Sequence, residues 1–339
     1  MPKEDIAVRV LITGATGFIG YHVAKTLREK SLDVRALARA GSDISALESL
    51  GVEMTVGDIR DAESVKAALK GCSQLYHIAA DYRLWVPDPE SMYETNVQGT
   101  KNVMEAALEL GIEKVVYTSS VGVWAGDTEG RALNEETPSE LNRMVGHYKR
   151  SKYLAEKEVY RSIEKGLPAI IVNPSTPVGP FDRKPTPTGQ IIVDFMNGKI
   201  PAYLKTGLNF VDVADVAEGH WLASVYGRTG QRYILGNENM PLKAFFATLA
   251  RITGKRAPNI RLPYYPVMLL AYFNEVISKW VTKKPPKIPL TGVRMARGYM
   301  FFSSSKAVRE LKLPQHPIEA ALENAVKWFA DNGYPDQNQ

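Results

Sequence analysis

Short apolar runs alternate with amphipathic helical patterns along the first half of the chain. The apolar runs predict strands at residues 8–12, 34–38, 53–56, 75–78, 114–118 and 169–172. The patterns between them predict helices at residues 18–30, 45–50, 62–69, 91–110 and 148–164. Because these strands are apolar on both faces, we expect a parallel sheet that helices cover on both sides, which is a doubly wound α/β fold.

The second half of the chain has a different texture. Residues 121–146 are polar and turn-rich, which predicts a long excursion over the ligand-binding edge of the sheet. Five prolines between Pro174 and Pro187 then interrupt regular structure and mark a boundary. A strand near Phe210 and helices at 213–225 and 318–331 follow. We expect two parts: a larger domain of residues 1–173 with segments returning at about 207–235, and a smaller C-terminal substrate-binding region of residues 174–206 and 236–339.

Three glycines stand between the first predicted strand and the first predicted helix. Gly14, Gly17 and Gly20 follow a G-x-x-G-x-x-G spacing, which departs by one residue from the G-x-G-x-x-G dinucleotide fingerprint. On such a turn, Gly14 permits a positive φ, Gly17 admits a diphosphate close to the main chain, and Gly20 lets the helix pack on the strand. The N-terminus of the helix offers N–H groups to the phosphates. The turn therefore predicts a dinucleotide site on a Rossmann fold, the alternative being an ordinary glycine-rich turn.

Arg39 bears on the choice of cofactor. It follows the second predicted strand, where NAD-selective enzymes usually carry an acidic residue for the ribose 2′-hydroxyl. A guanidinium would instead meet a 2′-phosphate with two hydrogen bonds. The sequence therefore predicts a preference for NADP(H) over NAD(H). The alternative is that Arg39 stacks on the adenine without discriminating between the two cofactors.

Tyr148 and Lys152 are four residues apart in a predicted helix and so share one face. A phenol titrates at about pH 10, and we expect the neighbouring ammonium to lower the pKa of Tyr148 and make it a proton donor and acceptor. Ser120 closes the fifth predicted strand, where its hydroxyl would bind the reacting substrate oxygen. Each of these two features alone has a simpler explanation. Tyrosine and lysine recur at this spacing on solvated helices by chance, and serines at strand ends often only hydrogen-bond to backbone groups.

Several motifs together resemble one enzyme family. Residues 13–20, 96–100, 119–120 and 148–152, with Asp58, resemble an extended short-chain dehydrogenase/reductase of the NAD-dependent epimerase/dehydratase family. The resemblance spans nearly the whole chain. Residues 79–85, 173–180 and 184–189 are similar to dihydroflavonol 4-reductases and their bacterial relatives, most of all to proteins named hopanoid-associated sugar epimerases.

The resemblance implies roles for individual residues. Ser120 would bind the substrate oxygen, Tyr148 would act as general acid and base, and Lys152 would hold the nicotinamide ribose and tune Tyr148. Asp58 would receive the adenine amino group, the alternative being a turn-forming Asp. A homodimer is also implied, through helices such as 91–110 and the one that bears Tyr148. The implied cofactor-binding set is Gly14, Thr16, Gly17, Phe18, Ile19, Gly20, Arg39, Asp58, Ile59, Ala79, Ala80, Asp81, Thr118, Tyr148, Lys152, Pro174 and Thr176.

Three functions are compatible with these residues. The first is reduction of a carbonyl, with hydride from NADPH and a proton from Tyr148. The second is epimerisation or dehydration of a nucleotide sugar through a keto intermediate, for which Lys184, Arg261 and Arg294 are candidate diphosphate ligands that form no tight set. The third is a redox-sensing binding protein, which would have no need of the three catalytic residues together.

Substrate contacts are predicted from four residues with less pattern behind them. Trp85 and Trp124 follow sheet edges on the active side, and either line an apolar pocket or pack within loops. Asn96 either contacts cofactor or water near the site or braces its own helix. Thr188 falls in the loop that carries the family resemblance and is expected on the substrate side.

Residues 262–281 form the most apolar stretch of the second half of the chain. Asn274, Glu275 and Lys279 interrupt this stretch, so it is not expected to span a bilayer. We expect a substrate-region or core helix here. The alternative is an interfacial membrane helix beside Lys283, Lys284 and Lys287, which would give at most peripheral membrane association.

Composition narrows the remaining function classes. The 339 residues are 45% hydrophobic and 23% charged, with a net charge of +5 from scattered basic residues. Scattered charge favours a solvated surface over nucleic-acid binding, which leaves a small-molecule substrate, and an anionic one would be welcome. The single cysteine, Cys72, excludes an internal disulfide, and acidic residues run directly into the first strand in place of a signal peptide. A cytoplasmic enzyme is expected. The five histidines lack metal-ligand spacing, so no metal is predicted.

Overall fold

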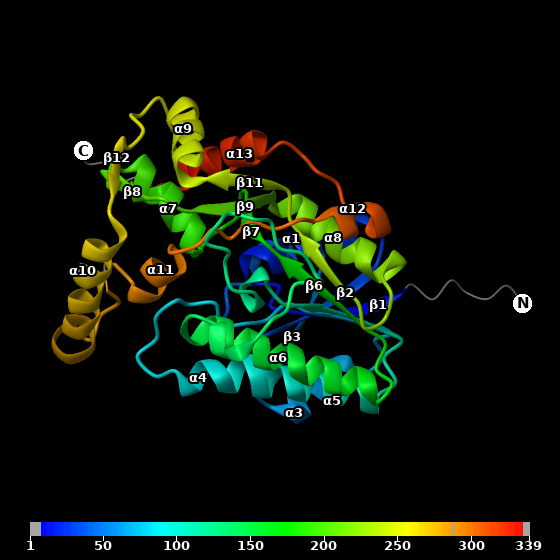
Figure 1. The fold of residues 1–339 in the computed structure, drawn as a ribbon. Helices are drawn as coiled ribbons and strands as arrows, with labels where there is room; N and C mark the ends of the chain where they lie inside the picture. Colours follow the sequence, from blue (N-terminus) through cyan, green and yellow to red (C-terminus); the bar gives the residue numbers. More distant parts are fainter. Residues whose placement is uncertain (1–7, 287, 335–339) are drawn as a thin grey trace, which may run out of the picture.

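The computed structural model describes residues 8–286 and 288–334. At its centre these residues form a parallel sheet of seven strands in the order β10-β6-β5-β4-β1-β2-β3 (Figure 1). The strands are β1 (Arg9–Thr13), β2 (Asp33–Ala38), β3 (Glu53–Val56), β4 (Gln74–His77), β5 (Lys114–Thr118), β6 (Ala169–Pro174) and β10 (Arg232–Leu235). Chain order reverses between β1 and β4, which puts the ligand-binding switch point of such sheets at the carboxyl ends of these two strands.

Helices cover both faces of this sheet because its strands are apolar on both sides. In β1, Val10 and Ile12 pack into one core cluster and Leu11 into another, and all three side chains are fully buried. The first cluster lies under α1 (Phe18–Glu29), α8 (Val213–Tyr226) and α12 (Ser305–Leu311), and the second under α3 (Ala62–Leu69), α5 (Gly99–Glu109) and α6 (Gly146–Glu164). The short α2 (Ser45–Glu48) precedes β3. The predicted doubly wound parallel fold is confirmed.

The helix predicted at residues 91–110 is not continuous. It consists of α4 (Glu90–Tyr93), the π-helical segment η1 (Glu94–Gln98) and α5. Within the wide π-helical turn, the amide of Asn96 faces inward and binds the backbone of Asp81, with Asp81 N donating over 2.7 Å and Asp81 O accepting over 2.8 Å. The hydrophobic pattern detects the helix but not this inserted turn, which often marks a functional site.

The smaller region has its own sheets and core. One sheet has the order β11-β9-β7, formed by β7 (Thr176–Val178), β9 (Gly207–Asp212) and β11 (Glu238–Pro241), and β8 (Ala202–Leu204) pairs with β12 (Ile260–Leu262). The helices α7 (Pro187–Met196), α9 (Leu242–Thr253) and α13 (Ile318–Asp331) enclose a core that includes Phe195, Phe245 and Phe329. Figure 1 shows this region above the carboxyl edge of the main sheet.

Residues 207–235, predicted to return to the larger domain, are divided between the two regions. Strand β9 joins the small sheet, whereas β10 joins the main sheet and α8 packs against it. The excursion at residues 121–146 contains two short 3-10 helices, η2 (Val121–Val123) and η3 (Leu141–Arg143). Isolated bridges from Asp127 to Tyr299 and from Leu133 to Phe302 tie this excursion to the C-terminal part of the chain.

The apolar stretch at residues 262–281 forms α10 (Tyr264–Ile277) and the π-helical η4 (Ser278–Thr282), at the left edge of Figure 1. Of the expected substrate-region or core helix, the core alternative is wrong, because Ala271 is the one buried residue of α10, which rests mainly on α11 (Leu290–Met295). None of the helices within the described residues is long and apolar enough to cross a bilayer. Lys287, predicted beside this stretch, lies outside the described residues.

Candidate active site

A cavity of about 870 Å³ opens at the carboxyl ends of the sheet strands. Gly14 follows β1 and Ala79 follows β4 on its wall, so the cavity includes the switch point of the sheet. Its walls also carry residues of α6, of α7 and of the segment around α11. A single cavity therefore joins the glycine turn, the predicted catalytic residues and the smaller region.

The glycine turn is shaped by the close approach of its own backbone. Gly14 has a φ of +79°, and a Cβ there would lie 2.6 Å from Ala79 N. A Cβ on Gly20 would lie 2.0 Å from Gly14 O, where no side chain fits. A Cβ on Gly17 would have Gly14 O as its one near neighbour, at 3.3 Å, and would otherwise meet open space. Gly14 and Gly20 thus serve the fold, while Gly17 keeps space free for a ligand.

This turn fits a dinucleotide cofactor. Helix α1 begins here with no side chain capping its first turn and no acidic residue in that turn. Phe18 and Ile19, at the start of the helix, line the cavity. Unpaired N–H groups and the positive end of the helix dipole are what a diphosphate requires.

All seventeen residues of the predicted cofactor set lie on the cavity wall. They come from turns far apart in sequence, after β1, β2, β3, β4, β5 and β6, together with the start of α1 and α6. Their roles toward a bound cofactor remain predictions, because the cavity shows only that they face one space. The predicted catalytic trio, Ser120, Tyr148 and Lys152, faces the same space.

Charged residues gather where the adenosine half of a dinucleotide would lie. Arg39 is exposed on the cavity wall, and no ion pair to it occurs within the described residues. The guanidinium of Arg60 donates to Asp58 over 2.7 Å and holds the pKa of that carboxyl below its usual value. Arg83 engages Asp81 in the same way. The sequence did not single out Arg60. Its position two residues after Asp58 was the available indication that the two side chains could form an ion pair.

Tyr148 and Ser120 both lie on the cavity wall, near enough for the serine hydroxyl to act on the phenol. Ser120 Oγ accepts from Gly122 N over 2.9 Å, which orients the hydroxyl at the end of β5. Burial raises the pKa of Tyr148 above the usual 10, and the Ser120 hydroxyl lowers it in part. The phenol is therefore protonated throughout the neutral range.

The expected lowering of this pKa by Lys152 is not what the structure shows. Lys152 Nζ instead donates to Tyr117 Oη over 3.0 Å and to Thr118 O over 2.8 Å, so its cation is held against the end of β5. Burial lowers the pKa of Lys152 itself to about 7, opposed by the carboxylate of Glu156. Spacing along a helix predicts that the two side chains share a face, but not where the longer one points.

Glu156 supports the base of the site from one turn further along α6. Its buried carboxylate accepts from Ser119 Oγ and, over 3.3 Å, from Asn173 Nδ2. Arg232 forms an ion pair with the same carboxylate over 3.4 Å. The side chain thus connects β5, β6 and β10 behind the catalytic residues, a role that no sequence motif indicated.

Lys149 is a second buried lysine on the cavity wall, and the sequence analysis missed it. Lys149 is 3% exposed, and among the described residues its ammonium meets only Trp124 O at 3.4 Å and Met300 Sδ at 3.5 Å. Burial without a countercharge lowers its pKa to about 8. Its place next to Tyr148 in sequence was the available signal.

Replacing Lys149 by methionine is expected to stabilise the protein. A pKa of about 8 in place of 10.5 means that burying the cation costs on the order of 3 kcal/mol, which an apolar side chain of similar volume avoids. The folded state binds fewer protons than the unfolded state between about pH 8 and 10.5, so wild-type stability rises across that window. The advantage of Lys149→Met should be largest below pH 8 and shrink above it.

Denaturant unfolding measured at several pH values tests this prediction. Lys157→Met, on an exposed position of the same helix, is the control and should change stability by no more than about 0.5 kcal/mol. An advantage of Lys149→Met that persists undiminished at pH 10.5 would contradict the electrostatic account.

The four predicted substrate residues are not brought together. Thr188 lines the cavity, whereas Trp85, Trp124 and Asn96 do not. Trp124 is fully buried against Phe302, and its indole donates to Thr137 O over 2.9 Å, so its prediction as a pocket residue is wrong. Asn96 braces the helices, since Nδ2 also donates to Ser151 Oγ over 2.9 Å. Trp85 is half-buried away from the cavity wall.

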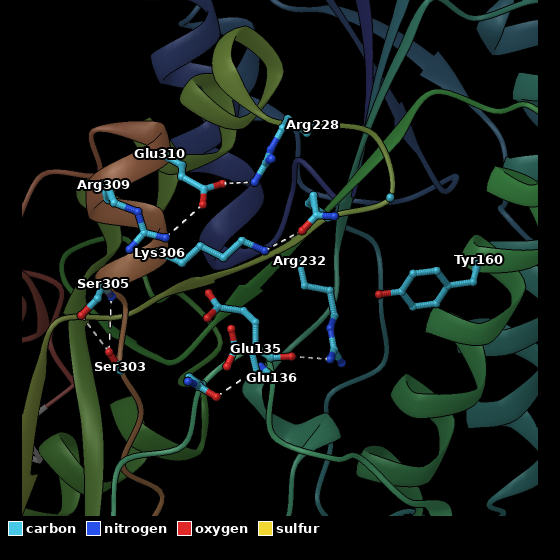
Figure 2. A pocket seen from close by; sticks show the side chains of 13 residues that line it. Glu135, Glu136, Tyr160, Arg228, Arg232, Ser303, Ser305, Lys306, Arg309 and Glu310 are labelled. Atoms are coloured by element: carbon cyan, nitrogen blue, oxygen red, sulfur yellow. Dashed lines mark hydrogen bonds and ion pairs between the residues drawn. The ribbon is translucent and has the colours of Figure 1, made fainter.

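A second cavity, of about 510 Å³, lies beside the edge strand β10, at the end where that strand begins. Figure 2 shows Arg228, Arg232 and Arg309 reaching into it with Glu135 and Glu310. Glu310 accepts from Arg228 and Arg309, and Arg232 donates to the backbone oxygen of Glu135. Arg228 and Arg309 are thus paired with a carboxylate of this cavity, whereas Arg39 in the first cavity forms no direct ion pair within the described residues.

Comparison with known proteins agrees with the site. The model of the NAD dependent epimerase/dehydratase family matches residues 10–236. A protein of Synechocystis sp. named "Putative dihydroflavonol 4-reductase" is 43% identical over 327 residues, with 95% of each chain covered. "Sterol demethylase protein B" of Methylococcus capsulatus is 32% identical over 95% of this chain and 98% of its own. The crystal structure of gox2253 is 46% identical, with a TM-score of 0.87 over 97% of this chain and 100% of its own.

The chain therefore belongs to the NAD dependent epimerase/dehydratase family and is an NAD(P)-dependent enzyme of the extended short-chain dehydrogenase/reductase type. This confirms the resemblance seen in the sequence. The reading as a binding protein without catalysis is set aside with it.

Proposed function

We propose that this protein is an NADP(H)-dependent reductase that converts a carbonyl of an apolar small molecule to an alcohol. One observation carries the proposal: a protonated Tyr148 lies with Ser120 on the wall of the same cavity as the glycine turn. The nicotinamide, when bound, would supply the hydride. The protein would supply the proton and hold the substrate oxygen between the two hydroxyl groups.

Each catalytic residue has a task in this proposal. Tyr148 donates its phenolic proton to the oxygen as the carbonyl is reduced, and its raised pKa ensures that it carries this proton at neutral pH. Ser120, oriented by Gly122 N, donates a hydrogen bond to the same oxygen. Lys152, fixed by Thr118 O, would hold the nicotinamide ribose.

The substrate end of the cavity supports an apolar compound. Its walls there carry aliphatic and thioether side chains from several elements of the smaller region, namely Ile191, Leu208, Leu242, Met295 and Met300. Lys184, Arg261 and Arg294, considered as ligands of a nucleotide diphosphate, are not on the cavity wall. Apolar walls with a few polar groups are typical of sites for small hydrophobic ligands.

The preference for NADP(H) rests on Arg39 and its surroundings. Arg39 forms no direct ion pair within the described residues, although its charge lowers the pKa of Asp58, which Arg60 engages, and of Asp81. A 2′-phosphate would give Arg39 an anion in direct contact.

Arg39→Ala is expected to lower kcat/KM for NADPH by about 10- to 100-fold, because one charge-assisted interaction is lost. The kcat/KM for NADH should change by no more than about twofold. Titration of the intrinsic fluorescence with each cofactor gives the same comparison for binding. Arg161→Ala, an exposed position of α6 paired with Glu158, is the control. Equal losses for the two cofactors would mean that Arg39 stacks on the adenine without discriminating.

Epimerisation or dehydration of a sugar through a keto intermediate is the second candidate, because the family that matches carries that activity in its name. It is also the activity in the name of the hopanoid-associated sugar epimerases that the sequence resembles. The two functions differ in their use of the cofactor. Reduction consumes one NADPH per product, whereas epimerisation returns the hydride and leaves the cofactor unchanged.

A screen that follows NADPH absorbance over ketones, aldehydes and nucleotide sugars separates the two. Oxidation of NADPH in proportion to alcohol formed supports the reductase. Isomerised sugar without net oxidation would support the epimerase and overturn the first proposal. The homodimer implied by the resemblance, through α5 and α6, belongs to the same proposal and is tested by light scattering.

A further inference from the structure

Helix α10 and the segment η4 expose an unusual amount of apolar surface. Trp280 is 74% exposed and Tyr265 69%, and Leu269, Leu270, Tyr272 and Phe273 are each more than half exposed. In Figure 1, α10 lies at the edge of the molecule, away from the main sheet. Contiguous exposed apolar patches of this kind mark sites of protein or membrane interaction.

The polar residues of α10 face inward instead. Glu275 accepts from Leu290 N over 3.2 Å, and Asn274 accepts from Ile288 N over 3.3 Å. On the same inner side, Ala271 packs with Leu290 and Val293 of α11. Tyr264, Val267 and Met268 also pack on this inner side. The outer face of the helix therefore carries aromatic and aliphatic side chains, where an ordinary surface helix exposes charged and polar ones.

The charges around this apolar surface have one sign. Between residues 255 and 284 the sequence has six basic residues, and its one carboxylate is the inward-facing Glu275. The basic side chains are all exposed: Lys255, Arg256, Arg261, Lys279, Lys283 and Lys284. Aromatic and aliphatic side chains bordered by lysines and arginines are the composition of helices that lie in the interface of anionic membranes.

We propose that α10 and η4 dock this enzyme on the surface of an anionic lipid bilayer, with the exposed apolar side chains in the interface and the basic ones at the headgroups. The helix has 14 residues and is too short to span, so it would lie in the membrane plane. A second copy of the chain is a poorer occupant, because a symmetric contact through this surface would oppose the same basic residues.

Docking in this way would bring one end of the active-site cavity to the lipid. Helix α10 packs on α11, and Gly292 and Met295 of α11 lie on the cavity wall. An apolar substrate would then pass between bilayer and cavity without crossing water. This consequence rests on the proposed function, whereas the docking itself does not.

Co-sedimentation of the full-length protein with phosphatidylcholine vesicles, prepared with and without phosphatidylglycerol, tests the proposal. We expect binding to the anionic vesicles that weakens as salt is added. The double variant Leu269→Ser/Phe273→Ser should lower the partition coefficient at least about tenfold, since buried methylene groups are lost. Lys283→Gln/Lys284→Gln should lower it by about fivefold for each lysine.

A matched control removes exposed apolar side chains elsewhere. Val225 and Tyr226, at the end of α8, are 46% and 54% exposed, and Val225→Ser/Tyr226→Ser should bind vesicles like the wild type. Thermal unfolding checks that every variant is folded. Equal reduction by this control and by Leu269→Ser/Phe273→Ser would overturn the assignment of the surface.

Two further outcomes would also overturn it. The wild type could remain in the supernatant with both kinds of vesicle. Alternatively, light scattering could find a dimer that Leu269→Ser/Phe273→Ser converts to a monomer while neither form binds vesicles, which would identify a second copy as the occupant. None of these measurements uses turnover, so their failure is distinct from a failure of the NADPH assay.

Discussion

Tyr148→Phe is expected to reduce the rate of carbonyl reduction by about a thousandfold while leaving cofactor affinity unchanged to within about twofold. The phenolic proton is the one that the proposed reaction transfers, and loss of a positioned acid typically costs 10²- to 10⁴-fold. The ring itself remains, so its contacts with the cavity are retained. Steady-state kinetics and a fluorescence titration with NADPH measure the two effects separately.

Tyr153→Phe provides the control for this substitution. It removes a phenolic hydroxyl from the same helix, at a half-buried residue that lies off the cavity wall. Turnover should stay within about twofold of the wild type. A Tyr148→Phe enzyme of near wild-type turnover would mean that another group delivers the proton, and the proposed mechanism would be wrong.

Gly20→Ala is expected to prevent stable folding. The added Cβ would lie 2.0 Å from Gly14 O. Gly14 O is a backbone atom and the Cβ position is fixed by the backbone of residue 20, so no side-chain rotamer relieves the clash. Either α1 moves off β1, exposing side chains such as Val23 and Leu27 that are now fully buried, or the turn distorts. We expect a loss of more than about 4 kcal/mol in the free energy of unfolding, measured by denaturant titration.

Gly17→Ala is the matched comparison, because it adds the same methyl group three residues earlier. Its Cβ would have one near neighbour, at 3.3 Å, and would otherwise occupy free space. The variant should fold with a loss of about 1 kcal/mol or less but bind NADPH at least about tenfold more weakly, since the methyl group occupies the approach to the main chain. Equal destabilisation by the two variants would contradict this division of roles.

Much of the cofactor half of the site was predictable because its residues sit at the ends of strands. Buried strands of a parallel sheet must be apolar on both faces, so their ends are visible in the hydrophobic pattern. The turns that follow β1, β2 and β3 then have to share one edge. Gly14, Arg39 and Asp58 could be assigned to one cavity in this way, although 44 residues separate the first from the last.

The substrate half could not be predicted in this way. Met295 reaches the cavity from α11, and Leu242 from the start of α9, and neither position follows from a strand end. Trp124 shows the same limit, since the sequence left open whether it lines a pocket or packs within loops, and the structure buries it in the core. Whether a large side chain packs inward or lines a cavity depends on neighbours distant in sequence, here Phe302.

The sequence by itself determined the layered α/β fold and the glycine turn, because each depends on local spacing and on the periodicity of buried positions. The proposed catalytic trio came from the resemblance to a family, and its roles stay predictions. Tertiary structure alone decided how the ionisable groups behave. Burial raises the pKa of Tyr148 and lowers that of Lys149, which has no countercharge among the described residues. A hydrogen bond to Thr118 O fixes the ammonium of Lys152. Tertiary structure also decided that the apolar helix α10 lies on the surface of the protein. Hydrophobicity indicates that a side chain favours burial, but not which neighbour buries it.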